Sequence, residues 1–142
     1  MGAKKKTLRV VLDTNVLVSA LILKGRLSGL VEFWRSGRIT PVLSRETFDE
    51  FRSVLEYSKF SLSKSEIQGI LQQEILPFFE VVERVDPVAG VCRDPDDDKF
   101  LACAVSAKVA FLVSGDKDLC SLRKFGPVRI LTPDQLLAML DR

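Results

Sequence analysis

The sequence predicts an α/β fold, a single three-layer α/β/α domain around a central parallel sheet of five strands. Five short apolar runs rich in β-branched residues have the length of buried strands. Helical segments separate most of these runs, and strands joined by helices lie parallel with right-handed crossovers. The length of 142 residues and the hydrophobic fraction of 46% suit one domain, residues 1–142, with its core at about residues 8–140.

Each predicted strand is an apolar run that ends at polar residues or a turn. The five are Leu8–Leu12, Ile39–Leu43, Phe79–Val85, Val109–Val113 and Val128–Leu131. Proline lacks the N–H group that a central strand needs, so Pro41 indicates an edge strand or the beginning of a strand.

The predicted helices are recognised by their caps and by their apolar faces. Ser44, Ser63 with Glu66, and Thr132 followed by Pro133 are capping signals, and Gly37 ends an earlier helix. The apolar stretch Val16–Leu23 follows the first strand, and the predicted helices are Ser28–Arg35, Ser44–Leu55, Ser63 to near Pro77, Asp98 to about Val105, and Thr132–Leu140.

The composition excludes several classes of enzyme. The chain has no histidine, which excludes catalytic triads with a histidine base and zinc sites with histidine ligands. Its three cysteines, Cys92, Cys103 and Cys120, have neither the spacing of a zinc site nor the even number of a disulfide framework. Catalysis would therefore use carboxylates, lysine, hydroxyls or a bound metal.

The charge is unevenly distributed along the chain. Residues 1–71 contain twelve Lys and Arg against seven Asp and Glu, whereas residues 72–142 contain nine against twelve. Ordinary solvated surface charge would account for this pattern; the more specific interpretation is a basic surface for a polyanion beside an acidic, metal-binding site. No apolar run reaches the ~20 residues of a membrane span, and Asp13 and Asn15 interrupt the apolar stretch behind the basic start Met1–Lys6. We expect a cytoplasmic protein without a membrane segment.

Four acidic residues are candidates for a site, and two of them follow strand ends, where α/β sheets build their sites. Asp13 follows the first strand, Asp116 follows the fourth, and Asp98 lies in the first turn of the helix before the fourth strand. Glu50 lies on the helix after the second strand, at the border of its apolar face. Taken singly, each is an ordinary turn, cap or surface acid.

Together these carboxylates predict a metal site. Crowded carboxylates raise one another's pKa unless a cation compensates them. An all-oxygen donor set suits Mg²⁺ or Mn²⁺. Such ions activate water for the hydrolysis of a phosphodiester, a reaction that needs no histidine.

Four ordered blocks resemble the PIN-domain family of metal-dependent ribonucleases, in particular its small prokaryotic branch of toxin components related to VapC. The resemblance extends from about Arg9 to Leu137. The blocks are LDTNV (Leu12–Val16), SRETFDEFRSVL (Ser44–Leu55), RDPDDDKFLACA (Arg93–Ala104) and LVSGDKDL (Leu112–Leu119).

The resemblance implies a catalytic, metal-binding quartet of Asp13, Glu50, Asp98 and Asp116. Asp98 is chosen within its acidic run because Asp98–Ala104 matches the family's helix start. The resemblance also implies auxiliary roles for four residues: Asn15 as a polar partner of the first acid, Ser114 as the hydroxyl before the last acid, and Asp94 and Asp118 as further or alternative ligands.

The same resemblance implies a PIN-like five-stranded sheet, Mg²⁺ or Mn²⁺ as cofactor, a homodimer, single-stranded or structured RNA as substrate, and an antitoxin protein as a possible partner. From their places in the sequence, Lys117, Arg45 and Arg52 are candidates for contacts with RNA phosphates, although a solvated surface charge is the simpler interpretation of each.

Two alternatives remain open on the sequence. A phosphatase of the haloacid-dehalogenase type also places Asp after its first strand, but it needs a second acid where this chain has Asn15. A non-catalytic domain that binds RNA or a protein could use the same scaffold. Exposure of Trp34, Phe33 and Phe78 would indicate a partner surface, whereas burial would make them core residues.

Overall fold

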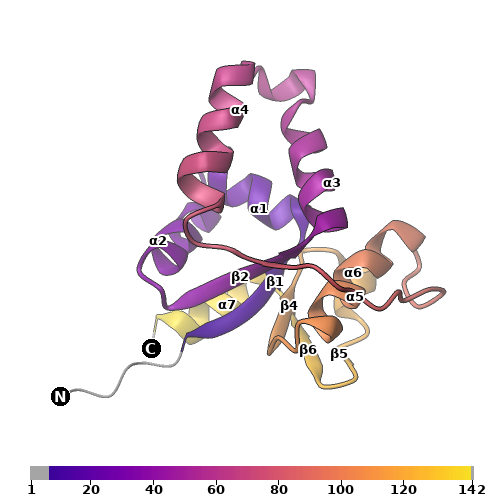
Figure 1. Ribbon diagram of the computed structural model, residues 1–142. Coiled ribbons are helices and arrows are strands. Elements are labelled where there is room, and N and C mark those ends of the chain that lie inside the picture. The colour runs from indigo at the N-terminus through magenta and orange to yellow at the C-terminus, as the bar shows by residue number, and fades with distance from the viewer. Residues whose placement is uncertain (1–6, 142) are drawn as a thin grey trace.

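A mostly parallel sheet forms the centre of the computed structural model, which describes residues 7–141 (Figure 1). The basic start, residues 1–6, and residue 142 lie outside the described range. The strand order is β3-β2-β1-β4-β6-β5. The strands are β1 (Leu8–Leu12), β2 (Ile39–Ser44), β3 (Glu80–Val82), β4 (Phe111–Val113), β5 (Lys124–Phe125) and β6 (Val128–Leu131).

Five of these strands run parallel, and they correspond to the five that the sequence predicts. The sixth, β5, is a short edge strand that pairs antiparallel with β6, with Phe125 opposite Val128. Gly126 makes the turn between them with a φ of +56°, a conformation that favours glycine. The sequence prediction missed β5 because a strand of two residues has no periodicity to detect.

The strand that contains Pro41 is internal to the sheet, not at its edge. Pro41 lies opposite Val10 of β1, but the pairing of β2 with β3 begins only at Val42. Pro41 therefore has one neighbouring strand, and its missing N–H removes no bond to β3. β3 is shorter than the predicted strand Phe79–Val85, because β2 ends at Ser44, opposite Val82.

Helices cover both faces of the sheet, which confirms the three-layer α/β/α arrangement. The helices that contribute to the core on one face are α1 (Thr14–Leu21), α2 (Gly29–Arg35), α3 (Arg45–Leu55), α4 (Lys64–Ile70) and α7 (Pro133–Leu140). The other face packs against α5 (Asp98–Ser106) and α6 (Lys117–Cys120). Along β1 the side chains alternate: Val10 and Leu12 join the first core and Val11 joins the second.

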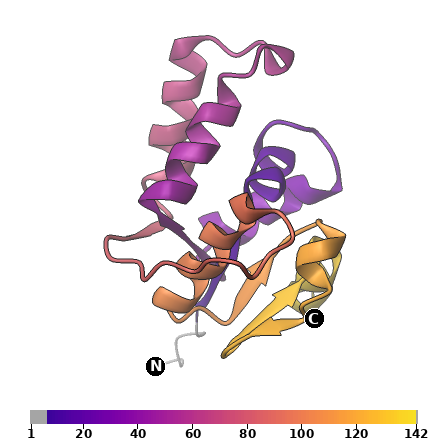
Figure 2. The ribbon, with the colours of Figure 1, turned by 90° about the vertical axis from the view of Figure 1, so that its right-hand side faces the viewer.

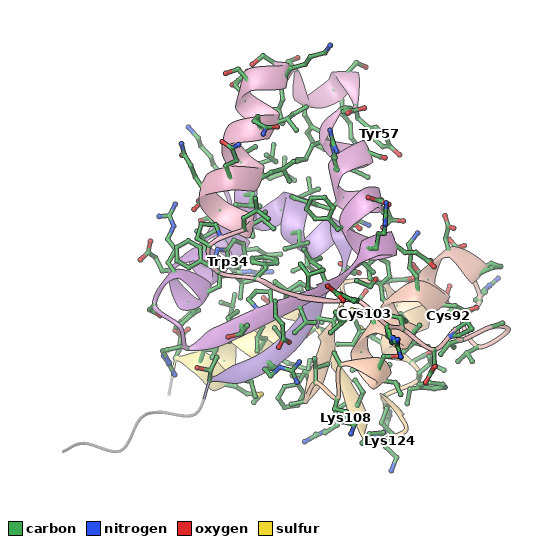
Figure 3. All side chains as sticks on the ribbon, viewed as in Figure 1. Trp34, Tyr57, Cys92, Cys103, Lys108 and Lys124 are labelled. Carbon is green, nitrogen blue, oxygen red and sulfur yellow. The ribbon has the colours of Figure 1, made fainter. Side chains whose placement is uncertain are left out.

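The aromatic residues considered as a partner surface belong to the first core. Trp34 is buried, and its ring meets that of Phe79 edge to face at 5.2 Å between centroids. Phe33 and Phe78 are half-buried and pack against the same cluster. Figure 3 shows Trp34 between the sheet and the helices above it.

The predicted capping residues begin the helices as expected. The Ser44 and Thr132 side chains accept hydrogen bonds from the backbone of α3 and α7, and Ser63 forms a capping box with Glu66 at α4. α4 continues directly through a π-helical turn, Leu71–Ile75.

α3 and α4 form an arm that rises from the sheet (Figures 1 and 2). The short helical turn η2 (Ser58–Phe60) follows α3 on the way to α4. Leu55 of α3 and Ile67 of α4 both belong to the first core. The outer side of α3, away from α4, is free to line a surface groove.

No helix between residues 7 and 141 is long and apolar enough to cross a membrane. The three cysteines are unpaired and pack in or against the second core. Burial and a hydrogen bond with Asp98 raise the pKa of Cys92 to about 12, and burial raises that of Cys103 to about 11. Both thiols stay protonated near neutral pH, in agreement with a packing role.

Candidate functional site

The candidate site lies where the order of the strands reverses. The chain passes from β1 to β2 and β3 on one side, and then crosses to β4 on the other side of β1. The carboxyl ends of β1 and β4 are therefore neighbours, and the Asp13 N–H donates to the Val113 carbonyl at 3.0 Å. Open α/β sheets bind their ligands at this kind of switch point.

Asp13 is buried at this point, with only 7% of its surface exposed. Its Oδ1 accepts a hydrogen bond from Val16 N at 2.9 Å and so caps α1, and its Oδ2 accepts one from Ser114 Oγ at 2.5 Å. Burial raises the pKa of Asp13 and outweighs these two hydrogen bonds, and the charges of Asp116 and Glu50 raise it further.

Ser114 joins the ends of the two strands. Its hydroxyl donates to Asp13 and accepts a hydrogen bond from Asp116 N at 3.0 Å. Asp116 is exposed and caps α6, since its Oδ1 accepts from Asp118 N at 3.0 Å. The structure thus brings together Asp13, Ser114 and Asp116, as the sequence predicts.

Asp98 does not face these residues. Its carboxylate accepts hydrogen bonds from Gly90 N at 3.1 Å and from Cys92 N at 2.8 Å, both in the loop before α5. The side chain is buried, yet these backbone bonds lower the pKa of Asp98 below its ordinary value. Asp98 therefore holds a loop, and its two oxygens are occupied by backbone N–H groups.

The adjacent acid, Asp97, faces the other carboxylates. Burial, a side-chain hydrogen bond with Asp116, and the charges of Asp116, Asp94 and Asp13 raise the pKa of Asp97 to about 7. Only a protonated carboxyl can donate to a carboxylate, so this hydrogen bond favours the neutral form. The structure thus directs Asp97, and not the predicted Asp98, toward the other acids, because one residue at a helix start turns the side chain by ~100°.

Glu50 reaches the same region from α3 and is held by two neighbours. Its Oε2 accepts a hydrogen bond from the Thr14 hydroxyl, and its Oε1 lies 2.6 Å from Lys99 Nζ. The Lys99 and Glu50 side chains are 16% and 26% exposed. Burial disfavours the charge of Lys99, but its hydrogen bond and attraction to Glu50 outweigh burial and raise its pKa.

Apart from Ser114, which is buried, the predicted auxiliary residues are exposed. Asn15 and Asp94 are exposed and line the groove beside Asp13, and Asp94 also caps the turn η4 (Pro95–Asp97). Asp118 is exposed and lies 3.8 Å from Arg93.

None of the three predicted phosphate contacts lines this groove. Lys117 is exposed next to Asp116, Arg45 lines a separate hollow of about 450 Å³, and Arg52 lines another near α4. The lysine that does line the groove is Lys59, which the sequence did not single out.

The groove itself has a volume of about 610 Å³, within the usual range of ligand sites. Its walls come from α1, α3, the turn η2 and the acidic run before α5. Its acidic end contains Asp13, Glu50, Asp94, Asp96 and Asp97, with Asn15 and Thr14 between them.

The donor set of this end fits a divalent cation by its chemistry. All side-chain donors are oxygen atoms. Burial is the main cause of the raised pKa of Asp13 and of Asp97, and the charges of neighbouring carboxylates add to it; a bound cation offsets both effects. Within residues 7–141, no group of three acidic or cysteine side chains is already arranged so that it could hold a metal ion. Mg²⁺ keeps several waters and needs only one or two direct carboxylates, so a prearranged group of three is not required.

The residues that sequence reasoning missed are those whose role depends on a neighbour. Asp97 is the same residue type as its neighbour Asp98, and only the direction of its side chain distinguishes the two. Thr14 and Lys99 contribute by holding the carboxylate of Glu50. The available signal was the acidic run itself, within which the sequence analysis selected Asp98 and Asp94 and not Asp97.

Fold and site together define a class of protein, an α/β domain with an acidic groove at the switch point of its sheet. The chain belongs to the PIN domain family, whose sequence model matches residues 9–118. PIN domains are in general nucleases and typically use divalent metal ions. Membership confirms the resemblance seen in the sequence and argues against the phosphatase alternative.

Known proteins support this assignment. MJ1680 of Methanocaldococcus jannaschii is 32% identical over 130 residues, which cover 84% of this chain and 78% of that protein. FitAcB from Neisseria gonorrhoeae has a TM-score of 0.59 at 18% identity, and the match covers 87% of this chain and 97% of that one.

Two further structures share the fold. PAE2754 from Pyrobaculum aerophilum has a TM-score of 0.58 at 14% identity and covers 99% of this chain and 98% of its own. The PIN domain endonuclease Utp24 has a TM-score of 0.52 at 21% identity, with coverage of 87% and 84%. At these identities the likeness concerns the fold alone.

Proposed function

We propose that this protein is an endoribonuclease that depends on Mg²⁺ or Mn²⁺. The observation that carries the proposal is the meeting of Asp13, Asp97 and Asp116, three carboxylates from three elements of the chain: Ser114 joins Asp13 to Asp116, and Asp97 faces both. Membership in a family of nucleases supports the reaction class. The absence of histidine agrees with chemistry that needs no imidazole.

Asp13, Asp97 and Asp116 would hold the cation, and Glu50 would assist from α3. When bound, the cation lowers the pKa of water and stabilises charge on the phosphate. The protein's own part is to orient these acids: Ser114 positions Asp13 and Asp116, and Thr14 and Lys99 position Glu50. Asp98 would act as a positioning residue that holds the loop at Gly90 and Cys92.

The test is cleavage of a labelled single-stranded RNA with Mn²⁺ and with EDTA. We expect cleavage only with the metal, and a loss of roughly 100-fold or more in both Asp13→Ala and Asp97→Asn. Asp13→Ala removes a carboxylate, and Asp97→Asn removes the negative charge of another. Cleavage that persists in EDTA, or full activity in both variants, would contradict the proposal. Metal-dependent binding without cleavage would favour the non-catalytic alternative.

The biological setting is a separate part of the proposal. The resemblance to the VapC-related branch supports a toxin role, with a homodimer and an antitoxin protein as partners. Co-expression with the product of an adjacent small open reading frame tests this role. We expect the two chains to copurify and the growth defect caused by the nuclease alone to disappear.

A further inference from the structure

The groove that contains the acidic site has a second end, which is lined by apolar, aromatic and basic side chains instead of acids. Leu23, Tyr57, Lys59 and Phe60 line this part, which we call the distal end. Leu23 and Tyr57 are 51% and 53% exposed, so two large apolar side chains face solvent in one groove. Surface apolar groups gathered in a groove beside an acidic site indicate a ligand with an apolar face.

α3 connects the two ends of the groove. Glu50, Val54 and Tyr57 lie at positions i, i+4 and i+7, on one side of the helix, and all three line the groove. Tyr57 follows the last helical residue, but its N–H donates to the Val54 carbonyl at 3.0 Å, which continues the turn. Seven residues rise by roughly 10 Å, about the length of three stacked nucleotides at 3.4 Å each.

The distal end also has a positive charge. Lys59 Nζ lies 5.2 Å from the centre of the Phe60 ring, so a cation and two aromatic rings occur together. Figure 3 shows Tyr57 on the side of α3 that faces away from α4. An aromatic face with an adjacent cation fits a nucleobase and its phosphate.

We propose that the distal end binds an unpaired nucleotide of the RNA strand, with the base stacked on Tyr57 and a phosphate near Lys59. This inference rests on the proposed nuclease function, since it names the form of RNA that the acidic site receives. A base inside a duplex is covered on both faces by its neighbours, so only a single strand can offer it to Tyr57. The distal end therefore accepts an unpaired nucleotide and not a paired one.

The test compares the affinity of a fluorescent oligoadenylate with that of an abasic strand of the same length, by anisotropy in a Ca²⁺ buffer. We expect the wild type to bind the base-bearing strand about 5- to 150-fold more tightly, the effect of one base–aromatic stack. Tyr57→Ala should lose most of this preference, and Tyr57→Phe should keep it. Leu76→Ala, an exposed apolar residue outside the groove, is the matched control.

The variant Lys59→Gln tests the contact with the phosphate independently of the stacking of the base. It should weaken the binding of both strands equally and lower the salt dependence by about one counterion. A Tyr57→Ala variant that keeps the full preference, equal wild-type affinity for the two strands, or no binding of either strand would overturn the inference. So would tighter binding of an RNA duplex than of the oligoadenylate.

A parallel assay with Mn²⁺ distinguishes this inference from the proposed function. Binding that depends on Tyr57 without cleavage would leave the distal site standing and refute the nuclease. Cleavage that is unaffected by Tyr57→Ala, together with unchanged strand preference, would refute the distal site alone.

Discussion

At the scale of residues, two adjacent aspartates have opposite environments. Asp98 accepts two backbone hydrogen bonds, which lower its pKa. Asp97 lies among other carboxylates, and burial together with these neighbours raises its pKa to about 7. Asp98 therefore stabilises a loop, whereas its neighbour Asp97 lies among carboxylates that could bind a metal ion. The difference arises because the two side chains point in different directions, although the residue type is the same.

This contrast predicts different phenotypes for Asp97→Asn and Asp98→Asn. Asp97→Asn should fold normally and lose activity by roughly 100-fold or more. Asp98→Asn should lower the free energy of unfolding by about 1–3 kcal/mol, because an amide cannot accept from both Gly90 N and Cys92 N. Urea unfolding and RNA cleavage measure the two effects. The reverse pattern would assign the catalytic role to Asp98.

The raised pKa of Asp97 predicts how stability depends on pH. Asp97 binds its proton more tightly in the folded state, with a pKa of about 7, than at the ordinary pKa of 3.8. Its contribution to stability is therefore complete below pH 3.8 and is lost as the pH rises through about 7. The melting temperature in EDTA should therefore fall between about pH 5 and pH 8.

Metal should reverse this loss, because a cation stabilises the ionised group. We expect Mn²⁺ to raise the melting temperature more at about pH 8 than at about pH 5, by a few degrees. Asp97→Asn should flatten both dependences. A metal effect that is equal at both pH values in the wild type would contradict this account.

At the scale of elements, the site depends on the contact between α3 and α5. Glu50 comes from the first and Lys99 from the second, and their pairing at 2.6 Å connects the arm to the acidic run. Thr14 from α1 holds the other oxygen of Glu50. Three elements that are distant in the sequence thus fix one carboxylate.

Removal of the lysine should destabilise this junction. Lys99→Met should lower the free energy of unfolding by about 1–2 kcal/mol, between the values for exposed and buried ion pairs, since Glu50 loses its partner. Lys117→Met, which changes an exposed lysine beside Asp116, is the control and should have little effect. Equal losses in the two variants, measured by urea unfolding, would refute the role of the pair.

The elements with strong local signals were predictable from the sequence. The five parallel strands and the capping residues Ser44, Ser63 and Thr132 follow from apolar runs and hydrogen-bonding side chains within a few residues. β5 and α6 were not predicted, because elements of two and four residues are formed by their surroundings and carry little pattern of their own.

At the scale of the whole molecule, the sheet separates two apolar cores. Trp34 belongs to one and Leu101 to the other, and both are fully buried. The strands between them contribute side chains alternately to both. If the chain is a single domain, as we propose, the two cores unfold together.

A mutation that creates a cavity in one core should therefore shift the unfolding transition that is measured in the other core. Leu101→Ala should lower the free energy of unfolding by about 2–5 kcal/mol. The single tryptophan, Trp34, reports unfolding by its fluorescence, and its transition should shift to lower urea with an unchanged slope. Leu76→Ala, at an exposed position, should leave it unchanged. A separate, unshifted Trp34 transition in Leu101→Ala would show two independent units.

The sequence by itself determined the α/β class, the strand ends that carry Asp13 and Asp116, and the absence of imidazole chemistry. These are local or compositional properties that a chain expresses wherever it folds. Only the tertiary structure decided that Asp97, and not Asp98, faces the other acids, that Lys99 pairs with Glu50, and that Tyr57 lies in the same groove. The physical reason is that direction and proximity between distant segments depend on how helices pack on the sheet, which no local pattern specifies.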